Sequence, residues 1–455
     1  MSTVATDLKR TIGFWGGTAI VVGSVVGSGI FRTPSSIAAV LQDPRLILAL
    51  WVGTGFLCLC GALALAELAT LLPRTGGSYV YLREAYGDSA AFTFGWLYVV
   101  AAIPSGIAAL AAFFAELVLR LFGVDPATAP AYVHSVIATS MLVTLSLINI
   151  RGTALGAAVQ TAFTVIKTAA VAVVIVVAFV LVDGSLSHFT AAPGGLSQNG
   201  GVVGLAAAVA AVFFTYNGWV YVGLVAGEIS EPEKRLQPIL VVGTLTIMTL
   251  YVLANLAYFY VFPVTEMVDK LVAQEVMELA FGPVGALVIG VAIAASVFGA
   301  MNGTILTNSR VAYALARDGL SFSVLGRCHP RFATPHVSIA VQCVMGIALV
   351  LWLKNFDALI SYFVVVEWSA LIFTIAAVFV LRRRMPDAPR PYRVPFYPWV
   401  PLVFVVGTTL GLAAIVWSRI ELQGDYAPLA GLGLACLGFP IYYVWRALTG
   451  RRPTS

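Results

Sequence analysis

The sequence contains few charged residues. Asp, Glu, Lys and Arg make up 10% of its 455 residues, against about 25% in ordinary soluble proteins, whereas 60% of the residues are hydrophobic. A water-soluble globule of this length needs far more charged surface, so a soluble enzyme, a nucleic-acid-binding protein and a disordered chain are excluded. The net charge of +5 is small and suits loops beside an anionic membrane surface.

Cysteine and histidine are also scarce. The five cysteines, an odd number, lie mostly in or at the ends of apolar runs, and the four histidines lie in loops or near the ends of such runs. No His-Glu-x-x-His, Gly-x-Ser-x-Gly or paired-Asp motif accompanies them. We therefore expect no disulfide framework, no metal site, no cofactor and no enzymatic activity. A channel is disfavoured as well, because no filter motif is present.

Long apolar runs dominate the chain and predict an all-α membrane protein. A helix needs about 20 apolar residues to cross a hydrocarbon core of ~30 Å. Twelve transmembrane helices are expected at residues 12–33, 46–72, 88–121, 132–150, 157–182, 201–227, 238–262, 283–309, 337–353, 358–381, 398–418 and 428–446. The first run continues past Val26 without a signal-peptide cleavage site, so we expect it to remain in the mature chain.

Lys and Arg gather in alternate connecting segments, which orients the helices. Under the positive-inside rule, residues 1–11 and 447–455 both lie in the cytoplasm. The expected location is the cell (inner) membrane, and the arginine run at residues 382–384 is expected to anchor a helix end.

Two of the expected helices carry polar, glycine-containing interruptions. They are GSVVGSGIF at residues 23–31 and FFTYNGW at residues 213–219. The first and sixth helices are related by a spacing of five, as two inverted five-helix repeats would place them, and such paired interruptions point to a transporter site. Free N–H groups at a half-helix start suit a carboxylate and free C=O groups at a half-helix end suit an ammonium. One pocket with both suits a free amino acid.

Several longer segments resemble known transporters. GSGIF at 27–31 and AELATLLPRTGGSYVYLREAYG at 66–87 resemble the amino acid–polyamine–organocation (APC) superfamily. FFTYNGW, GEISEPEKRLQPI at 227–239 and GAMNGTILTNSRVAYALARDG at 299–319 resemble its L-type amino acid transporter (LAT) branch, in a prokaryotic form. The resemblance implies a leucine-transporter-type fold. Its inverted five-helix repeats would be 12–182 and 201–381, with two additional helices in 398–446.

The resemblance also implies the substrate site. Ser28 and Gly29 would bind a carboxylate, carbonyl groups of Val25, Phe214 and Asn217 would bind an ammonium, and the Phe214 ring would cover the substrate. The full expected set is Val25, Val26, Gly27, Ser28, Gly29, Ile30, Phe214, Thr215, Asn217 and Asn302. For Asn302 the alternative is a hydrogen bond to another helix. Asn217 carries no charge, so small or medium neutral L-amino acids are favoured, such as Ala, Ser, Cys, Thr or branched ones.

Two charged residues fall inside expected helices, where an unpaired charge is costly. In relatives that do not depend on sodium, a lysine at the position of Lys167 replaces a structural sodium ion. Lys167 would then contact carbonyl groups near Gly23 and Val26. A proton-carrying role and a side chain that reaches the membrane surface are the alternatives.

Glu367 departs from the uncharged polar residue of related exchangers. It is a proton site, a specificity site for basic substrates, or a silent carboxyl hydrogen-bonded to a neighbouring helix.

The remaining acidic residues are expected near the membrane surfaces. Glu67 and Glu116 would be interfacial, and Glu228 and its neighbours would lie in a solvated loop, with a gate role as the alternative.

In eukaryotic members, a loop cysteine after the third helix joins a glycoprotein. Residues 123–131 contain none, so we expect no disulfide-linked heavy-chain subunit.

The expected function is sodium-independent exchange of neutral amino acids. The alternative is proton-coupled symport, which would accept cationic substrates through Glu367. Free amino acids and the lipid bilayer are the expected partners, and no nucleic acid is expected.

Overall fold

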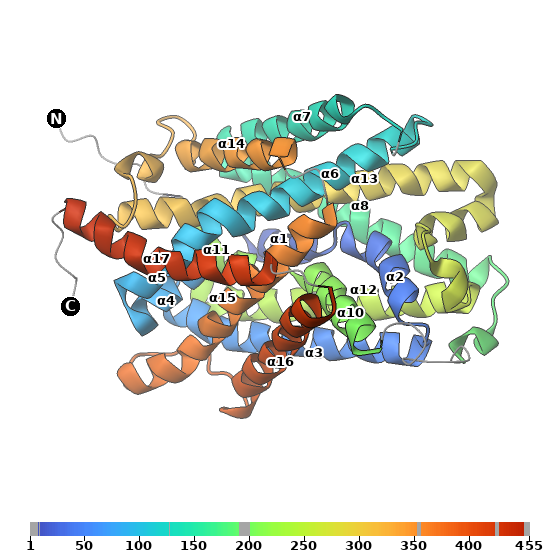
Figure 1. Cartoon of the computed structure of the whole chain (residues 1–455). Coiled ribbons are helices and arrows are strands. Elements are labelled where there is room, and N and C mark those ends of the chain that lie inside the picture. The colour runs from blue at the N-terminus through green and yellow to red at the C-terminus, as the bar shows by residue number, and fades with distance from the viewer. Residues whose placement is uncertain are drawn as a thin grey trace.

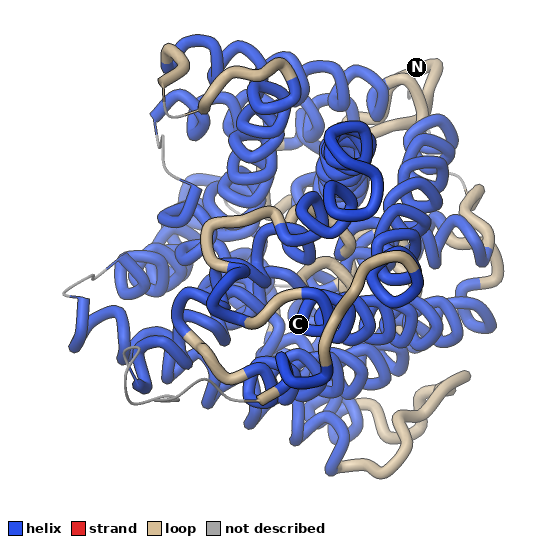
Figure 2. Tube along the Cα trace, turned by 90° about the vertical axis from the view of Figure 1, so that its right-hand side faces the viewer, coloured by secondary structure: helices blue, strands red, loops and turns tan. Residues whose placement is uncertain are grey.

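The computed structural model describes residues 8, 10–126, 128–190, 201–352, 356–423 and 427–449. Within these ranges the chain is helical and has no β-sheet, as the tube in Figure 2 shows. One isolated β-bridge joins Ile12 and Ile229. The predicted all-helical class is therefore confirmed. Of the two expected cytoplasmic termini, residues 1–7, 9 and 450–455 lie outside the described residues.

The helices follow the apolar runs of the sequence. The α-helices are α1 (Phe14–Val25), α2 (Gly29–Val40), α3 (Pro44–Leu71), α4 (Ser78–Tyr86), α5 (Asp88–Leu97), α6 (Ile103–Leu121), α7 (Ala131–Ile150), α8 (Thr153–Val180), α10 (Gly201–Tyr216), α11 (Tyr221–Leu224), α12 (Pro232–Val261), α13 (Val272–Arg317), α14 (His336–Trp352), α15 (Phe356–Arg384), α16 (Trp399–Gln423) and α17 (Ala427–Thr449). Short helical turns are η1 (Tyr98–Ala102), η2 (Leu186–Phe189), η3 (Ala226–Glu228), η4 (Val264–Met267) and η5 (Ser323–Gly326).

Length and composition identify which described segments suit a membrane. Nine of them are long and apolar enough to cross one, and α10 and α14 are apolar but shorter. Each of the expected ranges coincides with helical structure, for example 46–72 with α3 and 157–182 with α8. The long helices run side by side, and the described chain begins and ends towards the same end of the molecule, which carries the termini (Figure 1). Among the closest pairs, α12 lies against α3 and α8 against α13.

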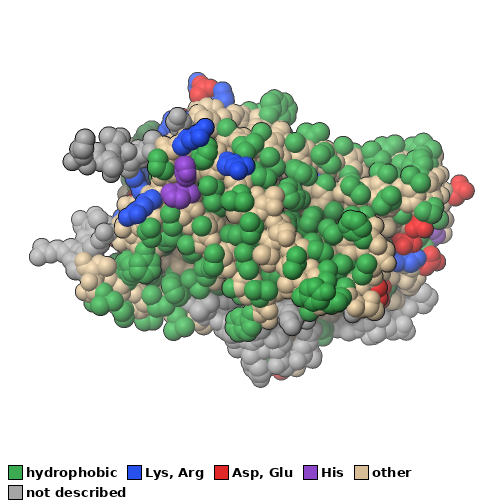
Figure 3. All heavy atoms as spheres, turned by 90° about the horizontal axis from the view of Figure 1, so that it is seen from above, with side chains coloured by type: hydrophobic (Ala, Val, Ile, Leu, Met, Phe, Trp, Pro, Cys, Tyr) green, Lys and Arg blue, Asp and Glu red, His purple; other side chains and the backbone are tan. Residues whose placement is uncertain are grey.

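The surface separates apolar and charged side chains. On the face shown in Figure 3, hydrophobic side chains cover the middle of the molecule, and Lys, Arg and His gather towards the end that carries the termini. Exposed apolar residues on the long helices include Val165, Val284 and Leu410. An apolar belt between two polar ends is what a bilayer requires of a protein that spans it.

Three local features differ from the simple helical prediction. The range 88–121 is divided into α5, a π-helical turn and α6, because Pro104 lacks the N–H that a continuous ladder needs. The range 283–309 is extended into α13, which is kinked where Gly282 has φ of 65° ahead of Pro283. Residues 78–86, expected in a connecting loop, form α4.

Candidate substrate site

Both predicted interruptions are breaks in the helices. The first helix stops at Val25 and resumes at Gly29, with Val26 in an extended conformation. The second stops at Tyr216, turns through residues 217–220 and resumes at Tyr221. Gly218 in this turn has φ of 120°, and a β-carbon there would lie 3.0 Å from the Ser24 backbone. Glycine is therefore required by both the conformation and the approach of the two breaks.

A cavity of about 40 Å³ lies between the breaks. It is lined by Ser24, Val25, Gly27, Ser28, Gly29, Gly106, Leu110, Phe214, Thr215, Asn217, Tyr221, Ala300, Thr304 and Phe363. Most of the expected binding residues therefore come together, although Val26, Ile30 and Asn302 do not line the cavity. Tyr221 of α11 and residues from α6, α13 and α15 complete the lining, and nothing in the sequence pattern distinguishes these positions.

The cavity offers unpaired polar groups. The Oγ atoms of Ser24 and Ser28 and the Nδ2 atom of Asn217 are buried and have no hydrogen-bond partner among the described residues. The first N–H groups of α2, which begins beside Ser28, lack intrahelical acceptors, as at any helix start. Since an unpaired buried polar group costs free energy, these groups favour a polar, partly anionic ligand in the cavity.

The Tyr251 hydroxyl connects the two breaks from the side. It lies 2.9 Å from the Val25 carbonyl oxygen and 3.2 Å from the Thr215 carbonyl oxygen, so it is positioned to donate to either. The ring is fully buried against Trp51 and Tyr216. Tyr251 thus fixes the carbonyl ends of both half-helices. Nothing in the apolar run around it distinguishes this tyrosine in the sequence.

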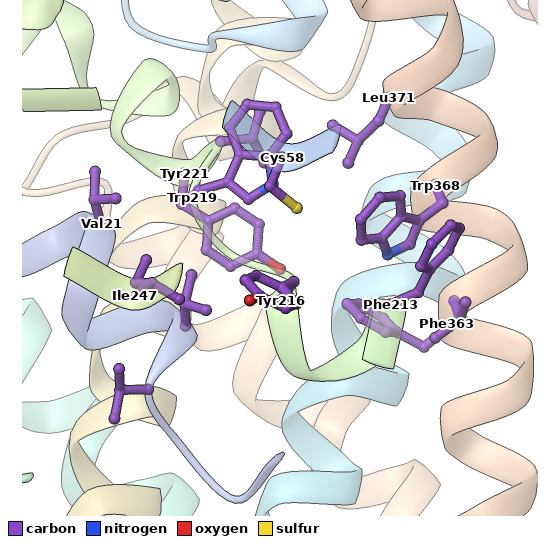
Figure 4. Packing of buried hydrophobic residues seen from close by; sticks show 14 of the residues in the cluster. Val21, Cys58, Phe213, Tyr216, Trp219, Tyr221, Ile247, Phe363, Trp368 and Leu371 are labelled. Carbon is purple, nitrogen blue, oxygen red and sulfur yellow. The ribbon is translucent and has the colours of Figure 1, made fainter. Parts of the chain in front are cut away.

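Aromatic side chains form one wall of the site. Phe214 is half-buried and meets Phe363 with the ring centroids 6.2 Å apart. Phe213, the neighbouring residue, stacks on Trp368 with a centroid separation of 4.1 Å, and Figure 4 shows these rings between α10 and α15. The stacked pair fixes the end of α10 against α15, so that Phe214 lies at the cavity.

Lys167 lies beside the first break and not in the cavity. Its side chain is fully buried, and Nζ donates to the carbonyl oxygens of Gly23 (2.5 Å) and Ser296 (3.2 Å). The Val26 carbonyl accepts instead from Ser296 Oγ at 3.4 Å. The ammonium therefore joins α8 to α1 and α13, and it does not reach a membrane surface.

Asn302 connects helices away from the cavity. Its amide nitrogen donates to the Gly156 carbonyl and to Gln160 Oε1, and its amide oxygen accepts from Asn149. These bonds hold α13 against α7 and α8.

Glu367 lies behind the cavity wall with an exposed fraction of 1%. Its Oε1 atom accepts a hydrogen bond of 3.0 Å from the Tyr98 hydroxyl, and its Oε2 atom has no partner within the described part of the chain. Asn217, a neighbour of Glu367, accepts a 2.9 Å bond from the Tyr221 hydroxyl. The carboxyl group is thus separated from the cavity by one residue.

Two acidic side chains are buried and paired with arginines. Glu228 is fully buried, and both of its oxygens accept from Arg310, at 2.8 and 3.0 Å, so its expected place in a solvated loop is wrong. Glu67 is also buried, and it accepts from Arg382 and from the Val394 N–H. The arginine run therefore does more than anchor a helix end, since Arg382 joins α15 to α3.

Comparisons of the sequence show which known proteins the chain is similar to. The model of the amino acid permease family matches residues 12–444. The serine/threonine exchanger SteT of Bacillus subtilis (strain 168) is 32% identical over 447 residues, which cover 97% of this chain and 98% of SteT. The b(0,+)-type amino acid transporter 1 of Mus musculus is 30% identical, covering 97% of this chain and 91% of its own. The large neutral amino acids transporter small subunit 2 of Homo sapiens is 30% identical, covering 96% and 80%.

These matches extend over nearly the whole chain and include relatives of the L-type branch, so the resemblance found in the sequence is confirmed. The expectation that the chain is not an enzyme is confirmed by the same matches. The chain belongs to the amino acid permease family and is a multi-pass membrane transporter of amino acids.

Proposed function

We propose that this chain exchanges small neutral L-amino acids across the cell membrane without sodium, by alternating access. The observation that carries the proposal is the cavity between two broken helices, where helix starts and helix ends meet. The N–H groups at the start of α2 suit the substrate carboxylate, and the carbonyl ends of α1 and α10 suit its ammonium.

The topology we propose has twelve transmembrane helices, with both termini in the cytoplasm. Residues 12–182 and 201–381 form inverted repeats of five helices, and 398–446 supply two further helices. The order of broken helices and the basic side chains at the end of the molecule that carries the termini support this proposal. We further propose that the chain works without a disulfide-linked subunit, since residues 123–131 contain no cysteine.

Substrate size and polarity follow from the lining. The cavity is small, and it holds unpaired groups at Ser24, Ser28 and Asn217 that suit a short side chain with a hydroxyl. SteT, which is named for serine and threonine exchange, is consistent with this chemistry. We therefore favour serine, threonine, alanine and cysteine among the neutral amino acids.

Sodium independence rests on Lys167. Its ammonium bridges carbonyl groups of α1 and α13, as a cation would. Because the protein supplies this positive charge itself, no sodium ion is needed between these helices.

The test is uptake of a labelled amino-acid panel into liposomes that contain the purified protein. Exchange predicts uptake that requires amino acid inside the vesicles and does not change when sodium is replaced by choline. Uptake into empty vesicles driven by an acidic outside bath would instead support the second candidate, proton-coupled symport. That candidate rests on the buried carboxyl of Glu367 with its unpaired oxygen.

Replacing Asn217 with Leu should reduce the preference for hydroxylated substrates. The variant loses a buried donor that would pair with a substrate hydroxyl, a bond worth about 0.5–1.5 kcal/mol. We expect serine uptake to fall by about three- to tenfold relative to alanine uptake in the same vesicles. Equal losses for both substrates would contradict the assignment of Asn217 to the side-chain pocket.

Replacing Tyr251 with Phe should weaken substrate binding more than it slows turnover. The variant frees the carbonyl oxygens of Val25 and Thr215 from their shared donor, so both half-helix ends lose a fixed position. We expect KM to rise by about three- to tenfold, measured from uptake rates over a range of substrate concentrations. Tyr258→Phe, buried on the same helix, is the matched control and should leave KM unchanged.

A further inference from the structure

A second, smaller cavity is lined by Tyr98, the residue whose hydroxyl donates to Glu367. It has a volume of about 10 Å³, and its lining includes Tyr98, Asn308, Ser309, Ala312, Ser338 and Gln342. Asn308, Ser309 and Ala312 belong to the last part of α13, and this part runs towards the end of the molecule that carries both termini (Figure 1). The cavity is distinct from the substrate cavity, with which it shares no lining residue.

Two amide side chains at this cavity have atoms without a hydrogen-bond partner among the described residues. Gln342 is 6% exposed, and neither its Nε2 nor its Oε1 atom makes a hydrogen bond within the residues described. The Oδ1 atom of Asn308, 3% exposed, is also unpaired in that part of the chain. A buried water needs a volume of about 10–15 Å³ and two to four polar partners. The cavity is large enough for one water molecule, and the unpaired amide groups supply its partners.

The cavity has polar connections in both directions. Towards the substrate, the Tyr98 hydroxyl donates to Glu367, whose neighbour Asn217 lines the substrate cavity. Towards the end that carries the termini, Ser338 Oγ donates to the Leu325 carbonyl in the loop between α13 and α14. The polar groups thus continue from the substrate cavity to a loop at the surface.

We propose that a water molecule in this cavity carries protons between the cytoplasm and Glu367 through Tyr98. In the loading step, a hydronium ion in the cavity gives a proton to Tyr98 Oη while the original hydroxyl proton passes to Glu367 Oε1. Hydronium becomes water, the Glu367 carboxylate becomes a carboxylic acid, and Tyr98 ends as a neutral hydroxyl. No electrons are transferred. This proposal rests on the second candidate function above, proton-coupled amino-acid transport, to which it adds the route of the proton.

Among the described residues, no charged side chain is a neighbour of Glu367. Its carboxyl is therefore the proton acceptor of this route. Of the titratable groups on the packed elements, Tyr98 and Tyr221 face the carboxyl. The charged side chains described on the helices packed against α15 are not neighbours of the Glu367 carboxyl. These side chains are Arg45, Glu67, Arg83, Glu84, Glu116, Arg120, Arg419, Glu421 and Arg446. A change of charge at Glu367 is therefore not compensated by a nearby ion pair. Because Asn217 separates Glu367 from the substrate cavity, an occupant of that cavity changes the surroundings of the carboxyl.

The test follows the Glu367 carboxyl by infrared difference spectroscopy of the full-length protein in lipid. A carboxyl band that responds to pH and is lost in Glu367→Gln is expected without any substrate. In Gln342→Leu, deuterium exchange of that band should slow by about tenfold or more, because the route then crosses an apolar gap. Thr408→Val is the matched control, since it also removes a buried unpaired polar atom but lies on α16.

The same samples connect the route to transport. With L-serine and a pH-sensitive dye inside the liposomes, substrate-dependent proton movement should be lost in Glu367→Gln and slowed in Gln342→Leu. A wild-type band that ignores pH, or equal exchange rates in Gln342→Leu and wild type, overturns the proton route. Serine transport without proton movement overturns it too and leaves the transport proposal standing, whereas a failure of the amino-acid panel with a titrating Glu367 band removes the transport proposal.

Discussion

Lys167→Met should reduce amino-acid transport by about two orders of magnitude or more. The variant keeps the length of the side chain but removes the ammonium that donates to the Gly23 and Ser296 carbonyls. Each hydrogen bond from a charged donor contributes about 1.5–3 kcal/mol, and 1.36 kcal/mol corresponds to tenfold. The break in the first helix would lose its connection to α8 and α13, so the substrate carboxylate would meet backbone groups that are no longer fixed.

The measurement is initial uptake in sodium-free liposomes, with protein amounts matched by fluorescence. Lys234→Met is the control, because Lys234 is exposed and forms only a surface pair with Glu231. High sodium should restore part of the activity in a smaller variant, Lys167→Ala, since an ion can occupy the vacated space. Wild-type rates in Lys167→Met would remove the cation role from this side chain.

Arg310→Met should destabilise the folded protein by about 3–5 kcal/mol, because it leaves the Glu228 carboxylate buried without its partner. Arg310 also donates to Thr153 and to the Leu306 carbonyl, so the variant removes several bonds at the junction of α8, α13 and η3. We expect a clear fall in the melting temperature in detergent and a comparable loss of folded protein in the membrane.

The double variant Arg310→Met/Glu228→Gln separates charge from packing. It contains no unpaired buried charge, so most of the lost stability should return. Arg235→Met provides the surface comparison, because its pair with Glu231 is half-exposed and such pairs contribute about 0–1 kcal/mol. If both single variants lowered the melting temperature equally, burial of the Glu228–Arg310 pair would not be the reason for its effect.

The helices and both breaks could be predicted from the sequence for a physical reason. A run of apolar residues long enough for a bilayer has few alternatives to a helix. Glycines clustered inside such a run, as at 23, 27 and 29, indicate where the helix fails. The residues that line the cavity from these two segments were expected from the family resemblance and not from that pattern alone, and Ser24 was not among them.

What the sequence did not reveal depends on contacts between distant segments. Tyr251 and Gln342 are single polar residues in apolar helices, and only the packed structure brings the first to two carbonyl groups and the second to a small polar cavity. Glu228 follows a helix end and precedes a charged stretch, which suggests solvent, yet Arg310 lies 82 residues further along the chain and meets it in the interior.

A side chain at Gly29 would affect both breaks at once. A β-carbon there would lie 2.5 Å from Thr215 Cγ2, so Gly29→Val would first displace the side chain of the other break before it filled the substrate space. A loss of transport in this variant would therefore report the contact between the two breaks as well as the space between them.

The discontinuous helices have a consequence for how specificity evolves in this architecture. On the proposed mechanism, main-chain atoms recognise the part that all amino acids share, and no substitution can delete a main-chain carbonyl. Selection is then free to vary the surrounding side chains, such as Asn217 and Phe363, and so to adapt one scaffold to new substrates. The α-amino and α-carboxyl groups that all these substrates share are still recognised.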